Sequence, residues 1–436
     1  MDKAYAPLGP SDVEHVVHLL DQHPAYLFPN LCSLTLFDNA ATYYFEWLTK
    51  DKKNKMVRWF RDLIQLGPTM LALHYYLVPF IVPDLPAIKS IRKLKISGSP
   101  WNSESGDVEL TLCEMVPQLT SLESFCGDMW SWDVLRHLGQ LPALQELSVE
   151  LPRTPPDSPH HKDGAFFSQL KVLDIRGTHL SIAELLRCSN FDKLTTFSAE
   201  IISPDDSSEI QVLDLIPYHC RQLQSLCLRQ HIHLPTDVHK LYLYRNIQVL
   251  SITLHARVVQ EQWNDDDLVS LTKGLPHLER FYVLDKSQGN LPSPRTAFTL
   301  RALLDLVEGC SKLEHICMDF DAKRRSQFKS LSKRKKGHAV RNHSVRHLSV
   351  CTSAVTSRKR LARILSRLLP CLEVIAVAPY AKDRSGWKSV AEWHRNSPLF
   401  RSQTDDAMPG SLGTDEGMTL CTVESLGFEM EVLRSD

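Results

Sequence analysis

The hydrophobic residues of this chain recur in a short frame: one apolar residue, a second three positions later, and a third two positions after that. Residues 223–228 and 313–318 both fill this frame, and each has a cysteine three residues before its start. Because the side chains of a strand point alternately to its two faces, the frame predicts short strands with one apolar face. Clear copies begin at Leu31, Ile91, Leu144, Leu170, Leu223, Ile247, Leu278, Leu313, Val345 and Leu372, and weaker copies begin at Met70, Leu119, Leu194 and Val423.

Between these copies the apolar spacing changes from that of a strand to that of a helix. Residues 300–307 and 358–369 have apolar side chains at three- and four-residue intervals, and Ser181 with Glu184 has the spacing of a helix capping box. A strand and a helix that repeat every 25 residues or so predict parallel strands with the helices on one side. Prolines that end the helices stand two positions before the frame at Pro29, Pro68, Pro117, Pro142, Pro276 and Pro370.

The frame at 170–175, Leu-Lys-Val-Leu-Asp-Ile, resembles the leucine-rich repeat. The segments that lead into the frame at 27–36, 141–144 and 369–372 resemble those of the substrate-recognition region of fungal-type F-box proteins. The resemblance implies an α/β, irregular leucine-rich-repeat solenoid, with parallel strands on the concave face and helices on the convex face. Repeats of this kind share one elongated core, so each repeat depends on its neighbours for stability.

The repeat array is expected to span residues 28–378, between an N-terminal helical cap at 1–27 and a C-terminal cap at 379–436. Within the C-terminal cap, residues 401–418 are expected to be disordered and residues 423–428 to form a last strand. Three insertions are expected to interrupt the array: a long or broken helix at 43–66, a proline-rich loop at 152–164 and a basic segment at 321–338.

The function implied by the resemblance is non-catalytic recognition of a protein partner on the concave face, as in the substrate-binding half of an F-box ubiquitin-ligase receptor. No F-box is visible in the 27 residues before the first repeat. A Skp1-type adaptor is therefore expected as a partner only if an F-box is missing from this gene model.

The strand residues that alternate with the apolar positions are expected to face the concave side. Arg and Tyr are enriched among the residues that dominate binding energy at protein interfaces, so they are candidate anchors. An ordinary solvated sheet face is the alternative interpretation. The candidate partner-binding residues are Arg176, Glu200, Arg229, Arg280, Tyr282, His315, Asp319 and His347.

Catalytic and metal-binding chemistry find little support in the sequence. No nucleophile elbow, phosphate-binding loop, dinucleotide fingerprint or zinc-protease motif is present, so the protein is expected not to be an enzyme and to need no cofactor. His315, Cys317, His347 and Cys351 come from adjacent repeats and could lie near one another, but zinc usually takes its ligands from tight pairs on turns. We therefore predict no metal site and interpret these residues as part of the sheet face.

The basic insertion supports a second interpretation of the chain. Its two clusters could serve as a nuclear-import signal or as a patch that contacts phosphates, and a solvated loop is the third possibility. The alternative function is therefore that of a nuclear, nucleic-acid-associated protein. The clusters consist of Lys323, Arg324, Arg325, Lys333, Arg334, Lys335 and Lys336.

The composition argues against nucleic acid as the main partner and against a membrane. The 436 residues include 50 Lys and Arg against 51 Asp and Glu, a net charge of −1. The chain has no run of about 18 apolar residues that would predict a membrane span, and its first residues carry no apolar core of a secretion signal. The 11 cysteines form no Cys-x-x-Cys pair and are expected to be reduced thiols, in the cytoplasm, the nucleus or both.

Overall fold

The computed structural model divides into two compact units, the first formed by residues 1–199 and 206–222 and the second by residues 200–205 and 223–436. Within each unit the strands follow one another in the sheet in chain order. The structure describes residues 30–36, 50–78, 90–98, 106–128, 131–155, 166–202, 212–230, 241, 243–254, 264–285, 298–322, 341–350, 353, 355–377, 383–396 and 431–432.

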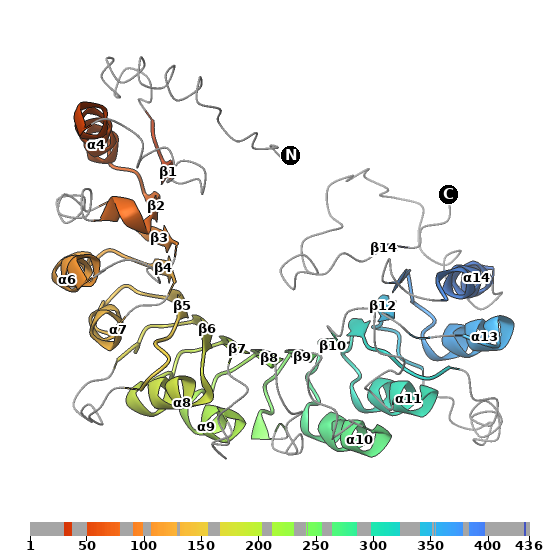
Figure 1. Ribbon diagram of the computed structural model, residues 1–436. Helices are drawn as coiled ribbons and strands as arrows, with labels where there is room; N and C mark the ends of the chain where they lie inside the picture. Colours follow the sequence, from red (N-terminus) through yellow and green to blue (C-terminus); the bar gives the residue numbers. More distant parts are fainter. Residues whose placement is uncertain are drawn as a thin grey trace. The chain divides into compact units, whose positions relative to one another are not determined.

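In the first unit, short parallel strands alternate with short helices. Figure 1 shows these helices on one face of their part of the sheet, while the other face is open. Neighbouring strands pair in parallel from β1 (Ser33–Leu36) through β2 (Met70–His74), β3 (Lys93–Ser97), β4 (Ser124–Gly127) and β5 (Glu146–Glu150) to β6 (Val172–Gly177), and β7 (Thr196–Ile201) lies at the boundary between the units. The helices are α4 (Lys50–Gln65), α6 (Gly106–Met115), α7 (Trp132–Gly139), α8 (His179–Cys188) and α9 (Val212–His219), with the 3-10 turns η1 (Tyr75–Leu77) and η3 (Val116–Gln118).

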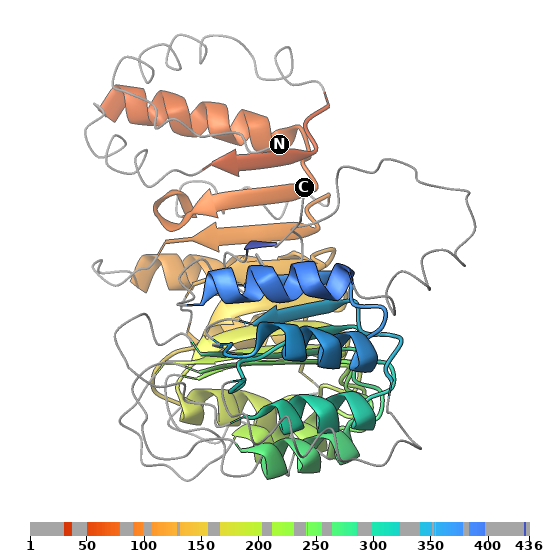
Figure 2. The same ribbon diagram turned by 90° about the vertical axis from the view of Figure 1, so that its right-hand side faces the viewer.

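The second unit repeats this arrangement. Its parallel strands are β8 (Ser225–Gln230), β9 (Val249–Leu254), β10 (Arg280–Asp285), β11 (His315–Cys317), β12 (His347–Val350) and β13 (Val374–Val377), and β14 (Glu431–Val432) pairs antiparallel with β13. The helices are α10 (Asp265–Gly274), α11 (Leu300–Gly309), α13 (Arg358–Leu368) and α14 (Arg384–Arg395), of which α13 and α14 lie side by side (Figures 1 and 2). None of the helices in the described ranges combines the length and hydrophobicity needed to cross a membrane.

This alternation confirms the α/β leucine-rich-repeat fold expected from the sequence. In most repeats the strand begins two residues after the first apolar position of the frame, as β6 begins at Val172 after Leu170. The second and third apolar positions of that repeat, Leu173 and Ile175, are buried. Burial of one aliphatic side chain contributes roughly 1.5–3 kcal/mol, so stacking of neighbouring repeats supplies the core that one repeat lacks.

The weak frame that begins at Met70 is wrong in register. Met70 pairs with Ser33, which stands two residues after the start of its own repeat, so the second repeat starts at Pro68. Met70 is 38% exposed, whereas Leu71 and Leu73 are fully buried. A proline in the first position hides this repeat from a search for apolar residues, although its ring is buried there as an aliphatic side chain would be.

The weak frame that begins at Leu119 is displaced by three residues. Ser124 pairs with the first residue of β5, which makes Leu122 the first apolar position and Phe125 the second. Both side chains are fully buried. Leu119 instead follows the turn η3, and its N–H donates to the carbonyl of Val116 at 3.1 Å. Two leucines three residues apart gave the pattern two possible starts, and the turn selects the later one.

The capping box predicted from Ser181 and Glu184 is wrong, because helix α8 begins two residues earlier, at His179. The N-cap is Thr178, whose hydroxyl accepts the N–H of Ser181 at 3.1 Å. Ser181 is buried, and its hydroxyl donates to the carbonyl of Pro152. The hydroxyl that was expected to begin the helix therefore joins it to the preceding repeat.

Several of the expected segments lie outside the described residues. They are the N-terminal cap at 1–27, the segment at 401–418, the strand at 423–428 and both basic clusters of the 321–338 insertion. Helix α4 (Lys50–Gln65) lies within the expected insertion at 43–66, of which residues 43–49 are not described. The limits of the two caps and of the repeat array stay predictions.

Candidate functional site

The open sheet face of the second unit presents side chains of β10, β11 and β12 that the strand register brings into two rows. In β11, Ile316 is buried in the core between His315 and Cys317. Because side chains alternate along a strand, His315 and Cys317 and the residues paired with them turn away from the helices. The first row holds Arg280, His315 and His347, the second holds Tyr282, Cys317 and Ser349, and together they form the open-face cluster.

The two histidines of the first row stack on each other. Their ring centroids are 4.4 Å apart and the ring planes differ by 7°. Loss of solvent around His315, together with the charges of His347 and Arg280, lowers the pKa of His315 to about 4. Desolvation also lowers the pKa of His347, although the nearby Glu373 carboxylate opposes that shift. Both rings are therefore neutral at pH 7, and the pair offers flat, polarisable surface with hydrogen-bonding nitrogens.

Two residues of the second row, Tyr282 and Cys317, are more deeply buried than the first row. Tyr282 is only 7% exposed and Cys317 only 5%. Burial is the main cause that raises the pKa of Tyr282 to about 12, so its phenol stays protonated at neutral pH. Tyr282 can thus supply a hydrogen-bonding hydroxyl, but little of its ring is available to a partner.

Three other candidates form ion pairs across neighbouring strands. In the first unit, Arg176 lies 3.4 Å from the carboxylate of Glu150. In the second unit, Arg229 lies 3.7 Å from the carboxylate of Glu200, and both side chains are about one-quarter exposed. Ion pairs at the protein surface contribute about 0–1 kcal/mol, so these two pairs are expected to add little to stability. The candidates are distributed over both units and do not form one cluster.

Asp319 does not belong to the open-face cluster. Strand β11 ends at Cys317, so the alternation that predicted an outward side chain at 319 does not continue that far. Asp319 is buried, and its carboxylate accepts both the N–H and the hydroxyl of Ser353 at 3.0 Å. The Ser353 hydroxyl in turn accepts the N–H of Phe320 at 2.9 Å. Asp319 therefore organises the loop after β11.

Two lysines on the open face of the first unit were not among the sequence candidates. Lys93 and Lys95 on β3 are exposed and alternate with the buried Leu94 and Ile96. The frame that begins at Ile91 is clear, so the alternation that selected Arg176 would have identified them as well.

The four residues considered as metal ligands are only partly brought together. His315 and His347 stack and Cys317 lies in the same strand as His315, while Cys351 lies outside the described residues. Among the residues with described positions, no group of three or more His, Cys, Asp or Glu side chains is arranged to hold a metal ion. The imidazole pair is therefore described as part of the open-face cluster.

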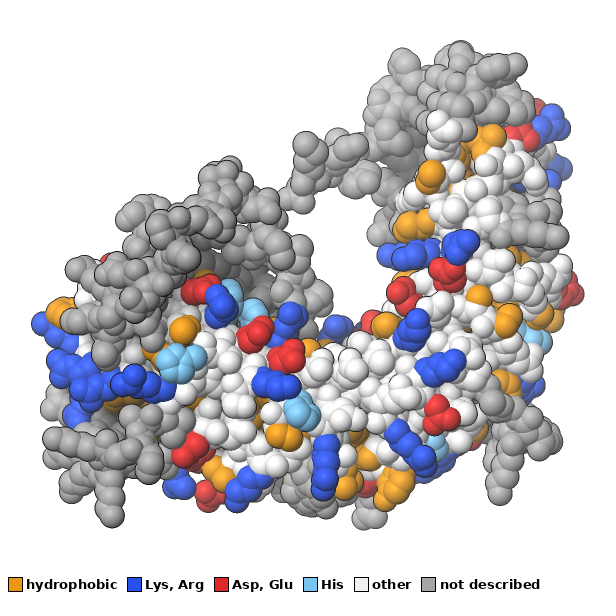
Figure 3. Space-filling view, turned by 180° about the vertical axis from the view of Figure 1, so that it is seen from behind, with side chains coloured by type: hydrophobic (Ala, Val, Ile, Leu, Met, Phe, Trp, Pro, Cys, Tyr) orange, Lys and Arg blue, Asp and Glu red, His pale blue; other side chains and the backbone are white. Residues whose placement is uncertain are grey.

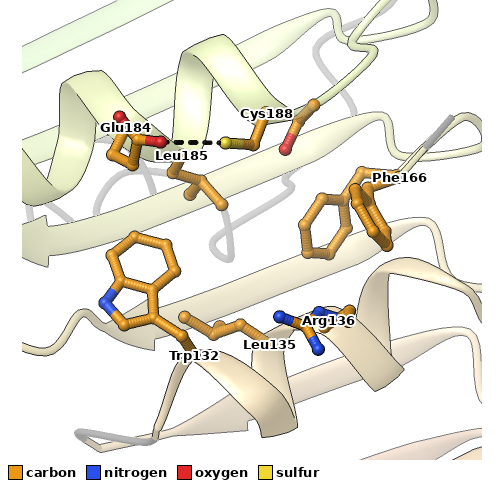
Figure 4. Close-up of a pocket in the computed structure, with 9 residues that line it drawn as sticks. Trp132, Leu135, Arg136, Phe166, Glu184, Leu185 and Cys188 are labelled. Carbon is orange, nitrogen blue, oxygen red and sulfur yellow. Dashed lines mark hydrogen bonds between the residues drawn. The ribbon is translucent and has the colours of Figure 1, made fainter. Parts of the chain in front are cut away.

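A groove in the first unit lies between helices α7 and α8 (Figure 4). Trp132, Phe166 and Leu185 give it a largely apolar lining, and the thiol of Cys188 donates a hydrogen bond to the Glu184 carboxylate at 3.1 Å. Burial and then this carboxylate raise the pKa of Cys188 to about 12. The thiol stays protonated at neutral pH and is not an activated nucleophile.

The imidazole pair makes stability depend on pH. Between pH 6.5 and about 4, an unfolded chain binds a proton at His315 that the folded chain does not, so the free energy of unfolding falls as the pH is lowered through this range. We expect the free energy of unfolding to fall by about 1–2 kcal/mol because of His315. This is less than the full pKa shift would give, because solvent screens the half-buried ring. Denaturant titrations at several pH values measure it.

The comparison variants for this experiment are His315→Gln and His277→Gln, of which His277 is exposed. Carboxylates also titrate near pH 4, so the informative quantity is the difference between variant and intact protein. The pH dependence should become shallower in His315→Gln and stay unchanged in His277→Gln. Equal slopes in all three proteins would show that His315 is not held neutral by its surroundings.

No protein-family model matches the chain, and no curated protein matches it. Among solved structures, an internalin from Listeria monocytogenes is 16% identical, covering 74% of this chain and 77% of that one with a TM-score of 0.41. The yeast Rad7 and Elc1 complex matches at 12% identity, 86% and 92% coverage and a TM-score of 0.37. At these values the similarities carry no argument about function, and the fold assignment rests on the strands and repeats described above.

Proposed function

We propose that this chain is a non-catalytic protein-recognition scaffold that binds a protein partner through the open-face cluster of the second unit. The observation that carries the proposal is the two-row arrangement of Arg280, Tyr282, His315, Cys317, His347 and Ser349 on a sheet face opposite the helices. Repeat proteins bind partners on extended faces of this kind. Each residue stands on a hydrogen-bonded strand, so the backbone loses little conformational entropy when the cluster is covered.

The chemistry of the cluster suits a protein partner better than a reaction. Arg280 offers a planar cation that can pair with a carboxylate in two parallel hydrogen bonds. The neutral rings of His315 and His347 offer stacked aromatic surface with hydrogen-bonding nitrogens, and Arg is enriched in the energetically dominant part of interfaces. Tyr282 is protonated at neutral pH and acts as a hydrogen-bonding group, not as a base.

The finer form of the proposal is that the partner is a substrate of an F-box-type ubiquitin ligase. It rests on the segments at 27–36, 141–144 and 369–372, which resemble the substrate-recognition region of fungal-type F-box proteins. In that case purification of the tagged chain from cells recovers a Skp1-type adaptor with cullin when the chain carries an F-box. If a chain that carries an F-box recovered open-face partners without any adaptor, the scaffold role would stand and the ubiquitin-ligase role would be excluded.

The scaffold proposal is tested by affinity purification of the intact chain and of the double variant Arg280→Ala/His347→Ala. Quantitative mass spectrometry should show that the recovered amounts of one set of proteins fall about tenfold or more in the variant. The reason is that loss of two anchor residues removes at least 1.4 kcal/mol of binding energy. The matched control is Lys273→Ala, which removes an exposed positive charge from helix α10 of the same unit. An unchanged set of proteins in the double variant, or an equal loss in the control, contradicts the proposal.

A further inference from the structure

Helices α13 and α14 give the second unit a second surface, on the helical side and separate from the open-face cluster. Helix α13 contains no acidic residue among its eleven, and five of them are basic: Arg358, Lys359, Arg360, Arg363 and Arg367. Figure 3 shows Lys and Arg side chains gathered on the surface at this end of the unit, at the left of the view. We call the basic residues of α13, together with Trp393 on α14, the basic helical face.

The basic residues of α13 point away from the core. Leu361 and Leu365 are fully buried on the side of the helix that faces the sheet. Lys359, Arg363 and Arg367 are exposed and succeed one another at four-residue intervals. At a rise of about 1.5 Å per residue, successive charges of this row lie about 6 Å apart along the helix. The row is therefore a regular line of positive charge along the helix.

The two helices of this face carry more basic than acidic residues. Arg358 lies 4.0 Å from the carboxylate of Asp383. Glu392 is the acidic residue of α14, which also carries the exposed Lys388. Three basic residues also occupy the first turn of α13, where the helix dipole is positive and cations are unfavourable. Sequence and dipole thus both leave an excess of positive potential, which a bound anion would relieve.

An aromatic side chain accompanies the row of charges. Trp393 on α14 is 46% exposed, and the ammonium of Lys359 lies 4.4 Å from the centre of its ring. A tryptophan beside a line of Arg and Lys is the combination with which proteins hold single-stranded nucleic acid, because the cations follow the backbone phosphates and the ring stacks on a base. An acidic peptide would need the charges but would gain nothing specific from the exposed indole.

We infer that the basic helical face binds single-stranded nucleic acid, with Lys359, Arg363 and Arg367 on successive phosphates and Trp393 stacked on a base. The arginines contact each phosphate through planar, two-pronged hydrogen bonds. Binding on this face leaves the open-face cluster free, so a protein partner and a nucleic acid can be held at the same time. The net charge of −1 makes this a local property of one face and not of the whole chain.

Fluorescence anisotropy of the full chain with a labelled single strand of about 20 nucleotides tests this inference, between about 50 and about 300 mM KCl. The double variant Arg363→Gln/Arg367→Gln should bind at least tenfold more weakly at low salt. The slope of log affinity against log salt should fall by about 1.4, because each lost phosphate contact removes about 0.7. Trp393→Ala should weaken binding about fivefold or more with the slope unchanged, since stacking is not ionic.

The control is Lys273→Gln/Lys312→Gln, which removes two exposed charges of the same sign from elsewhere in the second unit. Its affinity and slope should equal those of the intact chain. No binding by the intact chain at low salt, or equal weakening in the control, overturns the inference. Binding of a polyglutamate peptide at the same affinity as the oligonucleotide, unaffected by Trp393→Ala, also overturns it and would assign the face to an acidic protein segment.

Discussion

Leu226→Asp is expected to lower the free energy of unfolding by about 4 kcal/mol or more. Leu226 lies in β8, is fully buried, and pairs with the equally buried Leu250 of β9. Aspartate at this position places a carboxylate in an apolar core without a counterion or hydrogen-bond donors, and removes the packing of the leucine. Because each repeat is stabilised by its neighbours, the effect should spread to the adjacent repeats of the second unit. Denaturant unfolding followed by circular dichroism measures it.

The control for this substitution is Ser225→Asp, at the preceding residue of the same strand. Ser225 points to the open face and is partly exposed, so the new carboxylate stays hydrated. Its effect should stay within about 1 kcal/mol, the usual range for surface changes. A normal unfolding transition in Leu226→Asp, or equal destabilisation by both variants, would contradict the assignment of Leu226 to the core.

Trp387→Ala is expected to lower the free energy of unfolding by about 3–5 kcal/mol, the range for deletion of a large buried aromatic side chain. Trp387 anchors α14 and is fully buried. Its ring meets Phe320 edge-on at 5.9 Å, and its indole N–H donates to the carbonyl of Ser353 at 2.6 Å. The substitution removes both contacts and leaves the carbonyl without this donor. Thermal unfolding of the two proteins under identical conditions provides the comparison.

The same helix supplies a control in Trp393→Ala. Trp393 is about half-exposed, so its removal should change stability by less than about 1 kcal/mol. Trp387→Phe separates the two contributions of Trp387, since it keeps most of the packing and removes only the hydrogen bond, and should cost about 1–2 kcal/mol. If Trp387→Ala and Trp393→Ala lowered the free energy of unfolding by the same small amount, Trp387 would not anchor α14.

Most of the fold could be predicted from the sequence because the apolar frame sets the strand register directly. β6 and β8 both begin two residues after the first leucine of their frames, Leu170 and Leu223. The frame gave the wrong start of a repeat where proline replaced the aliphatic residue of the first position, or where two leucines offered alternative starts. Pro68 fills the first position of the second repeat, and Leu119 precedes Leu122 at the same spacing that the frame uses. Pairing between strands resolves both cases, and it is not visible in one segment of sequence.

The sequence predicted the face of the sheet on which the candidate residues lie, but not how far each side chain is buried. Alternation correctly placed Arg280, His315 and His347 on one face, because it depends only on strand geometry. It could not show that the Tyr282 side chain is buried among its neighbours, or that β11 ends before Asp319. The basic residues of α13 are plain in the sequence, but their meeting with an exposed tryptophan depends on how α14 packs against that helix.

A protein partner is expected to cover the open face of β10 to β12, and site-specific photo-crosslinking measures this directly. A benzophenone amino acid in place of Ser349, within the open-face cluster, should form a covalent adduct with the same proteins that Arg280→Ala/His347→Ala loses. The same probe in place of Lys273, on helix α10, should form none of these adducts. Adducts of equal yield from both positions, or from Lys273 alone, would contradict the account.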